Sequence, residues 1–342
     1  MSSPVLAGVL MTLGLNVLLP ATLILTVCWL IERTLVRWGW VEASLVQRAT
    51  LAGLVLMPLA LIGMNGLGPG ALYVSMPEPV GSADHTLGFV GWSYLVLSLV
   101  WLFGSLALWF RLLRGLWWTH RMLRHSTPAD PAWHAIVNDL ATRHGFKYSE
   151  VRVSSWISVP CVSGLRRPVL IIPSSVDPTW DYEGVLIHEL SHLRRRDPAW
   201  ALLSRALCAT LWVHPLAWRL HTWAGLTAEH ACDDEAIRRT GDPVAYSRAL
   251  LRFAERGWSS PRYAGVMSVG LTSSSHTLRG RVQRLLKPGA DQASVRRTAA
   301  RRAGMVLTIL LLTLTVLSST LVAIHHTDAA ALAGFAWLWC AA

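Results

Sequence analysis

The sequence has few charged residues, and long stretches of it contain no basic residue. Only 15% of the 342 residues are Asp, Glu, Lys or Arg, whereas 53% are hydrophobic, and the mean hydropathy is +0.40. No Lys or Arg occurs in residues 1–32, 49–110 or 303–342. An ordinary soluble domain is more polar than this, so the composition excludes a purely soluble protein and predicts membrane-spanning segments.

Paired cysteines and phosphate-binding loops are also missing. The five cysteines form no CxxC pair and fall in segments expected on different sides of a membrane, so no disulfide framework is predicted. The sequence has no internal repeat and no glycine-rich phosphate loop. These absences argue against a disulfide-stabilised secreted fold and against a P-loop nucleotide-binding domain.

Four uncharged stretches are long enough to cross a hydrocarbon core of about 30 Å. We expect membrane spans at residues 5–31, 49–67, 87–110 and 303–324. The first stretch is longer than the core of a signal peptide and has no basic residue before it, so we expect it to be retained. Tryptophans lie near the ends of the first and third stretches, as in interfacial belts: Trp29, Trp38, Trp40, Trp92 and Trp109.

The basic residues all follow the first or the third span, which the positive-inside rule places in the cytoplasm. We therefore expect a multi-pass protein of the bacterial inner (plasma) membrane with both termini outside. The loop 68–86 and the tail 325–342 would face out, and residues 111–302 would form a cytoplasmic domain. Topology explains the net charge of +11, so no direct nucleic-acid partner is expected. Arginines at 194–196 and 296–302 are candidates for contact with membrane lipid.

Residues 111–302 are enough chain for one small α+β domain. A basic, aromatic juxtamembrane helix is expected first, followed by a short helix and three strands, over residues 114–121, 128–144, 151–153, 158–162 and 168–172. A further helix should run from an N-cap at Asp177 to Asp197.

The third of these strands has two interpretations. An edge strand can pair with the backbone of an extended peptide, so Val169, Leu170 and Ile171 are expected to bind a peptide substrate by β-augmentation. The alternative is that residues 158–172 form a purely structural hairpin.

Residues 188–192 read HELSH, an HExxH sequence within an apolar, helix-compatible run. On a helix, His188 and His192 share one face, where two ring nitrogens can hold one metal ion. Neutral imidazoles suit Zn²⁺. Glu189 would lie beside the open coordination position and act as the general base on water, which is the chemistry of a zinc peptidase.

A third metal ligand is expected in a downstream helical segment, residues 228–235. Glu229 is the candidate, and Asp233, one turn later, would accept the second ring proton of a ligating histidine. His230 is a competing ligand, but it points about 100° away from Glu229 around the helix, so only one of the two can face the metal.

This ordered set of residues resembles the BlaR/MecR-type antirepressor family, membrane zinc metallopeptidases that relay a signal by intracellular proteolysis. The similarity covers residues 158–164, 167–173, 188–197, 212–218, 229–233, 246–251 and 278–282. The resemblance implies an inserted gluzincin-type domain in which His188, His192 and Glu229 bind zinc and Glu189 is the general base. Asp197, five residues after His192, belongs to the same pattern and is expected beside the ligands.

The resemblance implies an integral-membrane zinc endopeptidase that cleaves a cytoplasmic protein, a transcriptional repressor, in response to an outside signal. One alternative is a prenyl-protease or HtpX-type quality-control peptidase; the spacing to Glu229 and residues 212–216 favour the first reading. Another is a non-catalytic receptor, against which the intact motif argues. The family's best-known members carry a penicillin-binding sensor domain, but this sequence has no Ser-x-x-Lys signature. We therefore expect the signal to enter through the spans or a separate sensor protein.

Two details of the site stay open. Tyr246, Tyr263 and His276 are all candidates for stabilising the oxyanion of the tetrahedral intermediate. Cys232 is near the proposed site and could bind zinc, although beside Asp233 we expect it to pack as a small apolar residue.

Overall fold

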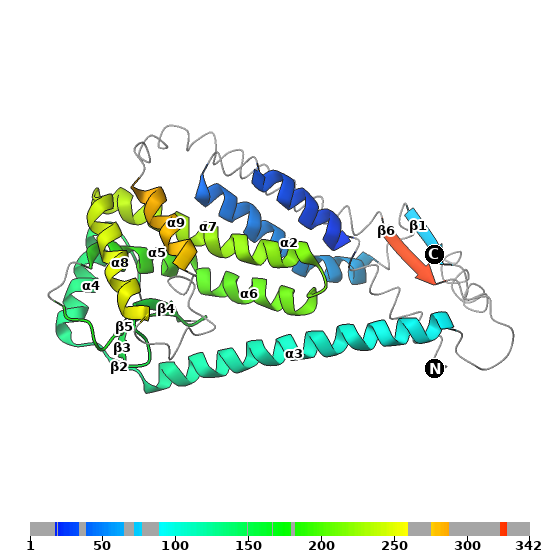
Figure 1. Cartoon of the computed structure of the whole chain (residues 1–342), viewed down its shortest axis with the longest axis horizontal. Helices are drawn as coiled ribbons and strands as arrows, with labels where there is room; N and C mark the ends of the chain where they lie inside the picture. Colours follow the sequence, from blue (N-terminus) through cyan, green and yellow to red (C-terminus); the bar gives the residue numbers. More distant parts are fainter. Residues whose placement is uncertain are drawn as a thin grey trace.

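The computed structural model describes residues 18, 20–33, 39–64, 72–76, 89–148, 150–165, 167–178, 182–258, 275–286 and 322–326. Most of these residues are helical, and the rest include one four-stranded and one two-stranded sheet. The expectation of a mostly α protein with a small sheet is therefore confirmed. Figure 1 shows the four-stranded sheet at one end of the molecule, with long helices extending from it.

Three helices form a layer beside the candidate site. Helix α2 (Trp40–Met64) packs against α6 (Asp197–Thr210) and α7 (Pro215–Thr240), as Figure 1 shows. Apolar side chains of these helices and of the helical residues 20–33 share one buried cluster. Gln47 of α2 also accepts a hydrogen bond from Thr227 of α7. These contacts fix α2 against the helix that carries Glu229.

Helix α3 (Phe89–His125) is continuous over 37 residues. It joins the predicted span 87–110 and the predicted juxtamembrane helix 114–121 without a break. Among the residues that the structure describes, its segment Leu95–His125 is the one helix long and apolar enough to cross a membrane. Leu97, Phe103 and Phe110 are 65%, 67% and 66% exposed. A core helix of a soluble domain would bury such residues, so α3 supports membrane association.

The other predicted spans are described only in part. Residues 20–33 are helical, and residues 49–64 belong to α2. Residues 1–17 and 303–321 lie outside the described residues, so most of the fourth predicted span remains a prediction.

The end of that fourth span differs from the expectation. Residues 322–324 belong to strand β6 (Val322–His326), which pairs in parallel with β1 (Leu72–Met76). Backbone pairing with a partner strand, which the sequence alone does not reveal, replaces the helix there. Strand β1 lies within the predicted loop 68–86, and β6 includes residues 325 and 326 of the predicted tail.

The four-stranded sheet has the strand order β2, β3, β5, β4. Strand β2 (Thr127–Pro128) is antiparallel to β3 (Val151–Ser154), β3 is parallel to β5 (Val169–Pro173), and β5 is antiparallel to β4 (Cys161–Ser163). All three strands expected from the sequence are present, and β4 begins three residues later than expected.

The prediction that residues 168–172 form a substrate-binding edge strand is wrong. Strand β5 is hydrogen-bonded to β3 on one side and to β4 on the other, so it has no free edge for a further strand. Every residue of both β4 and β5 is buried, Val169, Leu170 and Ile171 among them, so the strand pairing, and not the burial, is what rules out β5. The edge on this side of the sheet is β4 instead.

A second apolar core lies between the sheet and the helices α4 (Pro131–His144), α5 (Glu183–Arg195) and α8 (Pro243–Trp258). Helix α5 begins at Glu183 and not near Asp177. Tyr182, which precedes it, is buried against Trp133, with ring centroids 5.5 Å apart. Every residue from Gly184 to Leu193 in α5 is buried.

Glu235 of α7 forms ion pairs with one arginine of α5 and two arginines of its own helix, one of which is hydrogen-bonded to α4. This α7 residue is 9% exposed, and its Oε1 lies 2.9 Å from Nη2 of Arg194 in α5. Arg238 and Arg239 also contact it, and Arg239 donates to the carbonyl of the last residue of α4. Burial raises the pKa of Glu235, but Arg238, Arg239 and Arg194 offset this and lower it to about 2.

Replacing Glu235 with Gln should therefore destabilise the fold at pH 7, by about 1–3 kcal/mol. A carboxyl whose pKa is lower in the folded state than in the unfolded state stabilises the fold at any pH above the unfolded-state pKa. This contribution is lost as the pH falls through the folded-state pKa. Thermal unfolding in detergent should show the gap between wild type and Glu235→Gln narrowing below about pH 4.5. Asp139→Asn removes an exposed ion pair with Arg143 and should have little effect. A gap that is constant down to pH 3 would contradict this account.

Candidate metal centre

Two histidines on one face of α5 bring their ring nitrogens together. Nε2 of His188 lies 3.1 Å from Nε2 of His192, and the two ring planes are inclined by 81°. Each histidine is 1% exposed. Positions four apart on a helix lie one turn above each other, so the HELSH spacing produces this meeting of imidazoles.

Glu229 of α7 completes a group of three. Its Oε1 lies 3.4 Å from Nε2 of His192, and its Oε2 lies 3.5 Å from Nε2 of His188. Glu229 is 4% exposed, and its Oε1 accepts no hydrogen bond from the described residues. Two imidazole nitrogens and a carboxylate oxygen within 4.8 Å of one another are a suitable donor set for one divalent ion with an open position. The residues present therefore fit a catalytic metal.

Asp233 and Tyr246 support His188 from behind. Nδ1 of His188 lies 3.2 Å from Oδ1 of Asp233 and 2.9 Å from the Tyr246 hydroxyl, which itself donates to Oδ1 of Asp233 at 2.7 Å. A proton on Nδ1 satisfies these acceptors, which leaves the lone pair on Nε2 facing Glu229. Asp233 is fully buried, and burial raises its pKa, but Arg281 and His188 offset this and hold it well below its usual range.

Tyr246 is thus placed against the Nδ1 side of His188, away from the position of an oxyanion. A Cβ atom at Gly184 would lie 2.7 Å from the Tyr246 ring, so a glycine at this helical position lets Tyr246 approach His188. Of the other two oxyanion candidates, Tyr263 and the side chain of His276 lie outside the described residues.

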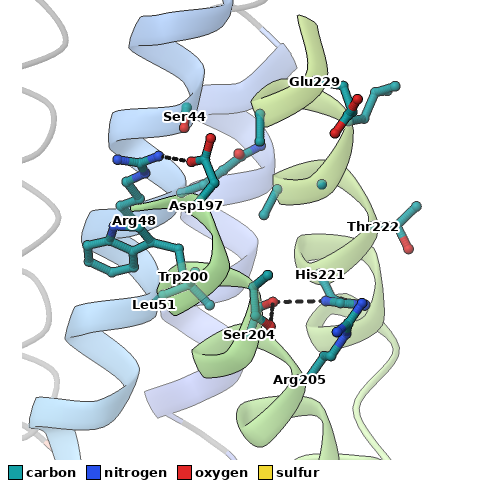
Figure 2. A pocket seen from close by; sticks show the side chains of 16 residues that line it. Ser44, Arg48, Leu51, Asp197, Trp200, Ser204, Arg205, His221, Thr222 and Glu229 are labelled. Carbon is teal, nitrogen blue, oxygen red and sulfur yellow. Dashed lines mark hydrogen bonds and ion pairs between the residues drawn. The ribbon is translucent and has the colours of Figure 1, made fainter. Parts of the chain in front are cut away.

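Asp197 supports His192 in the same way. Its Oδ2 accepts a hydrogen bond from Nδ1 of His192 at 2.8 Å. Burial raises the pKa of Asp197, but His192, Arg195 and Arg48 offset this and lower it to about 2. Arg195 lies 3.1 Å away, and Figure 2 shows the ion pair between Arg48 of α2 and Asp197. Both histidines are therefore oriented by a buried, ionised aspartate.

Cys232 offers an alternative grouping with His192 and Asp197. Its Sγ lies 3.4 Å from Nδ1 of His192. That nitrogen already donates to Asp197, so in this grouping neither the His192 Nδ1 lone pair nor the Asp197 oxygen that accepts its proton is free for a metal ion. The group with Glu229 is the better fit.

Glu189 lies next to His188 on α5 and is 1% exposed. Its Oε2 has no hydrogen-bond partner among the described residues. Burial raises the pKa of Glu189 above its usual value, although the two histidines partly oppose this shift. A carboxylate with a raised pKa is suited to take up a proton and release it again.

His230, the competing third ligand, points elsewhere. Its ring packs against the ring of Trp40 at an interplanar angle of 54°, with a centroid distance of 4.3 Å, and its Nδ1 lies 3.9 Å from Oδ2 of Asp233. Neither contact directs it to the paired Nε2 atoms. Glu229 therefore occupies the face of α7 that meets the two histidines.

A cavity of about 440 Å³ lies between α2, α6 and α7, and Glu229 is one of the residues that line it (Figure 2). Its apolar lining consists of Leu51, Trp200, Ala201, Ala224, Gly225, Leu226 and Ala228. Polar groups also line it, including Ser204, whose hydroxyl lies 2.9 Å from Nδ1 of His221. The metal centre thus borders an open space on the α2 side.

One residue of the site, Arg281, was not singled out from the sequence. Arg281 of α9 (Ser275–Leu285) is 0% exposed and contacts both Glu229 and Asp233. It lies in the segment 278–282 that ends the family resemblance, which was the one signal that could have identified it.

Comparisons with known proteins extend these observations. Residues 79–285 match the protein family described as BlaR1 peptidase M56, which is more than half of the 342 residues and includes the whole metal centre. The regulatory protein BlaR1 of Bacillus licheniformis is 32% identical over 108 residues, which is 29% of this chain. The aligned region spans only 17% of that relative's length.

Proposed function

The chain belongs to the BlaR1 peptidase M56 family, and from this premise we propose that it is an integral-membrane zinc endopeptidase that cleaves a cytoplasmic protein during transmembrane signalling. The observation that carries the proposal is the buried group of His188, His192 and Glu229 within the matched region. Family membership implies a metallopeptidase, and this donor set favours zinc among the metals.

His188 and His192 would hold the zinc through Nε2, and Glu229 through a carboxylate oxygen. The bound ion would supply Lewis acidity at the scissile carbonyl and lower the pKa of water. Asp233 and Asp197 keep the Nδ1 protons in place, so both Nε2 lone pairs stay available.

Glu189 is the proposed general base. It takes a proton from the attacking water as the water oxygen bonds to the carbonyl carbon, and it returns the proton to the amide nitrogen as the C–N bond breaks. Burial raises the pKa of Glu189, and a carboxyl with a raised pKa holds a proton more strongly than one with an ordinary pKa. Glu189 can therefore keep the proton between the two steps.

Strand β4 is the better candidate for pairing with the substrate backbone. It is an edge strand, and it packs against α5. Cys161 of β4 is close enough to Glu189 for that carboxylate to add to the rise in its pKa that burial causes. A peptide added to β4 would therefore run beside the catalytic carboxylate.

The substrate we propose is a transcriptional repressor in the cytoplasm. The aligned relative is described as a regulatory protein, and the charge distribution supports a cytoplasmic position for residues 111–302. Membrane lipid surrounds α3 in this proposal, and a separate sensor protein or the membrane spans deliver the signal.

The proposal is tested by mapping new protein N-termini in host cells that produce wild-type protein or Glu189→Gln at equal levels. We expect new N-termini in one or a few cytoplasmic proteins, a DNA-binding repressor among them, with the wild type alone. New N-termini spread over many membrane proteins would favour HtpX-type quality control. Identical profiles for both forms, under cell-envelope stress as well as without it, would favour a non-catalytic receptor.

A further inference from the structure

Arg281 is a charged side chain with no contact to solvent. It is 0% exposed and is the largest of the fully buried side chains among the residues that the structure describes. Burying a guanidinium costs a large amount of free energy unless its donors find anionic partners. The partners of Arg281 therefore show what offsets this cost.

The partners are two carboxylates of α7 that lie one helical turn apart. Nε and Nη2 of Arg281 donate to Oδ2 and Oδ1 of Asp233 at 2.9 Å and 2.6 Å. Nη1 lies 2.7 Å from Oε2 of Glu229. The planar guanidinium therefore forms a two-bond fork with Asp233 and a third contact with Glu229.

These contacts constrain the metal ligand and its neighbour together. A carboxylate on a flexible glutamate side chain can rotate, but the ion pair with Arg281 at Oε2 leaves Oε1 of Glu229 toward Nε2 of His192, at 3.4 Å. The fork on Asp233 fixes the oxygen that faces Nδ1 of His188. One cation also offsets the repulsion between two buried anions of the same helix.

We propose that Arg281 is a positioning residue of the metal centre, which holds Glu229 and Asp233 in the orientation that binds zinc. This role rests on the proposed function, because it presupposes that Glu229 is a metal ligand. Arg281 acts through Glu229 and Asp233 and has no direct contact with Glu189 among the interactions of the described residues.

The geometry distinguishes Arg281 from the other arginines of α9. Arg284 contacts Asp234, the carbonyl of His230, and Oδ2 of Asp233 at 3.5 Å, and none of its contacts is to Glu229. Arg279 is exposed. Arg279→Ala is therefore a matched control on the same helix, with the same loss of charge at a position remote from the ligands.

The test compares wild type, Arg281→Lys, Arg281→Ala and Arg279→Ala as full-length proteins purified in detergent. Zinc affinity is measured by competition with a chromogenic chelator, and the ligand geometry by the visible absorption of the Co²⁺-loaded proteins. We expect Arg281→Ala to bind zinc about 10- to 100-fold more weakly, with an altered Co²⁺ spectrum, whereas Arg279→Ala matches wild type. Millimolar methylguanidinium should partly restore both properties in Arg281→Ala.

Arg281→Lys keeps the charge but loses the fork, so it should fold and still bind zinc more weakly than wild type. If Arg281→Ala does not fold, Arg281→Lys alone tests the role of Arg281. If the wild type binds zinc, and if Arg281→Lys and Arg281→Ala have the same zinc affinity and Co²⁺ spectrum as the wild type, the role of Arg281 is overturned and the proposed function stays intact. A folded wild type that binds no zinc would overturn the proposed function itself, and the role of Arg281 with it.

Discussion

Replacing Glu189 with Gln should abolish peptide hydrolysis while leaving the metal bound. The substitution keeps the size of the side chain but removes the group that accepts the proton of water, so kcat should fall by about 10²- to 10⁴-fold. Metal binding should persist, because the donor set consists of His188, His192 and Glu229. Metal content by mass spectrometry and cleavage of a peptide or protein substrate give the two readouts.

Glu183→Gln is the matched control, since Glu183 lies on the same helix but is only partly buried and pairs with Arg143. It should retain both metal and activity. If Glu189→Gln hydrolysed substrate at the wild-type rate, Glu189 would not be the general base. If it lost the metal, Glu189 would have to be counted as a ligand or as essential to the packing of α5.

Replacing Glu229 with Ala should remove the metal. The loss of one of three protein ligands should weaken zinc binding by more than the 10- to 100-fold expected for a supporting residue, so the protein should be purified with little zinc and little activity. Zinc per chain after dialysis against a mild chelator is the measurement.

Two neighbours on α7 provide the controls for Glu229→Ala. His230→Ala removes the ring contact with Trp40, and this variant should still bind zinc. Cys232→Ala removes the thiol of the alternative grouping and should also keep it. Full zinc occupancy in Glu229→Ala would exclude Glu229, and loss of zinc in His230→Ala would make His230 the third ligand.

The sequence predicts those parts of the site that depend on local spacing. His188 and His192 meet because a helix repeats every 3.6 residues, and this periodicity can be read without knowledge of the fold. Glu229 and Asp233 are likewise one turn apart on a helix. Their position opposite the histidines depends on the packing of α5 against α7, and the sequence indicated it only through the need for a third metal ligand and through the resemblance to a family.

The parts that depend on long-range packing were missed. Strand β5 reads like any short apolar strand, and its place between β3 and β4 is decided by pairing with both. Helix α5 begins at Glu183, after a residue, Tyr182, that is buried against Trp133, far away in the sequence. Arg281 looks like an ordinary solvated arginine until its carboxylate partners on α7 are known, because arginines are rarely buried.

Arg48 connects the candidate metal centre to α2. It lies on α2 just before the predicted span 49–67, and it pairs with Asp197, which in turn accepts a hydrogen bond from His192. A path of three side chains therefore leads from this helix to a candidate metal ligand. If residues 49–67 cross the membrane as the sequence predicts, a change in the tilt of α2 would act on Asp197 through Arg48, and so on the orientation of the His192 imidazole.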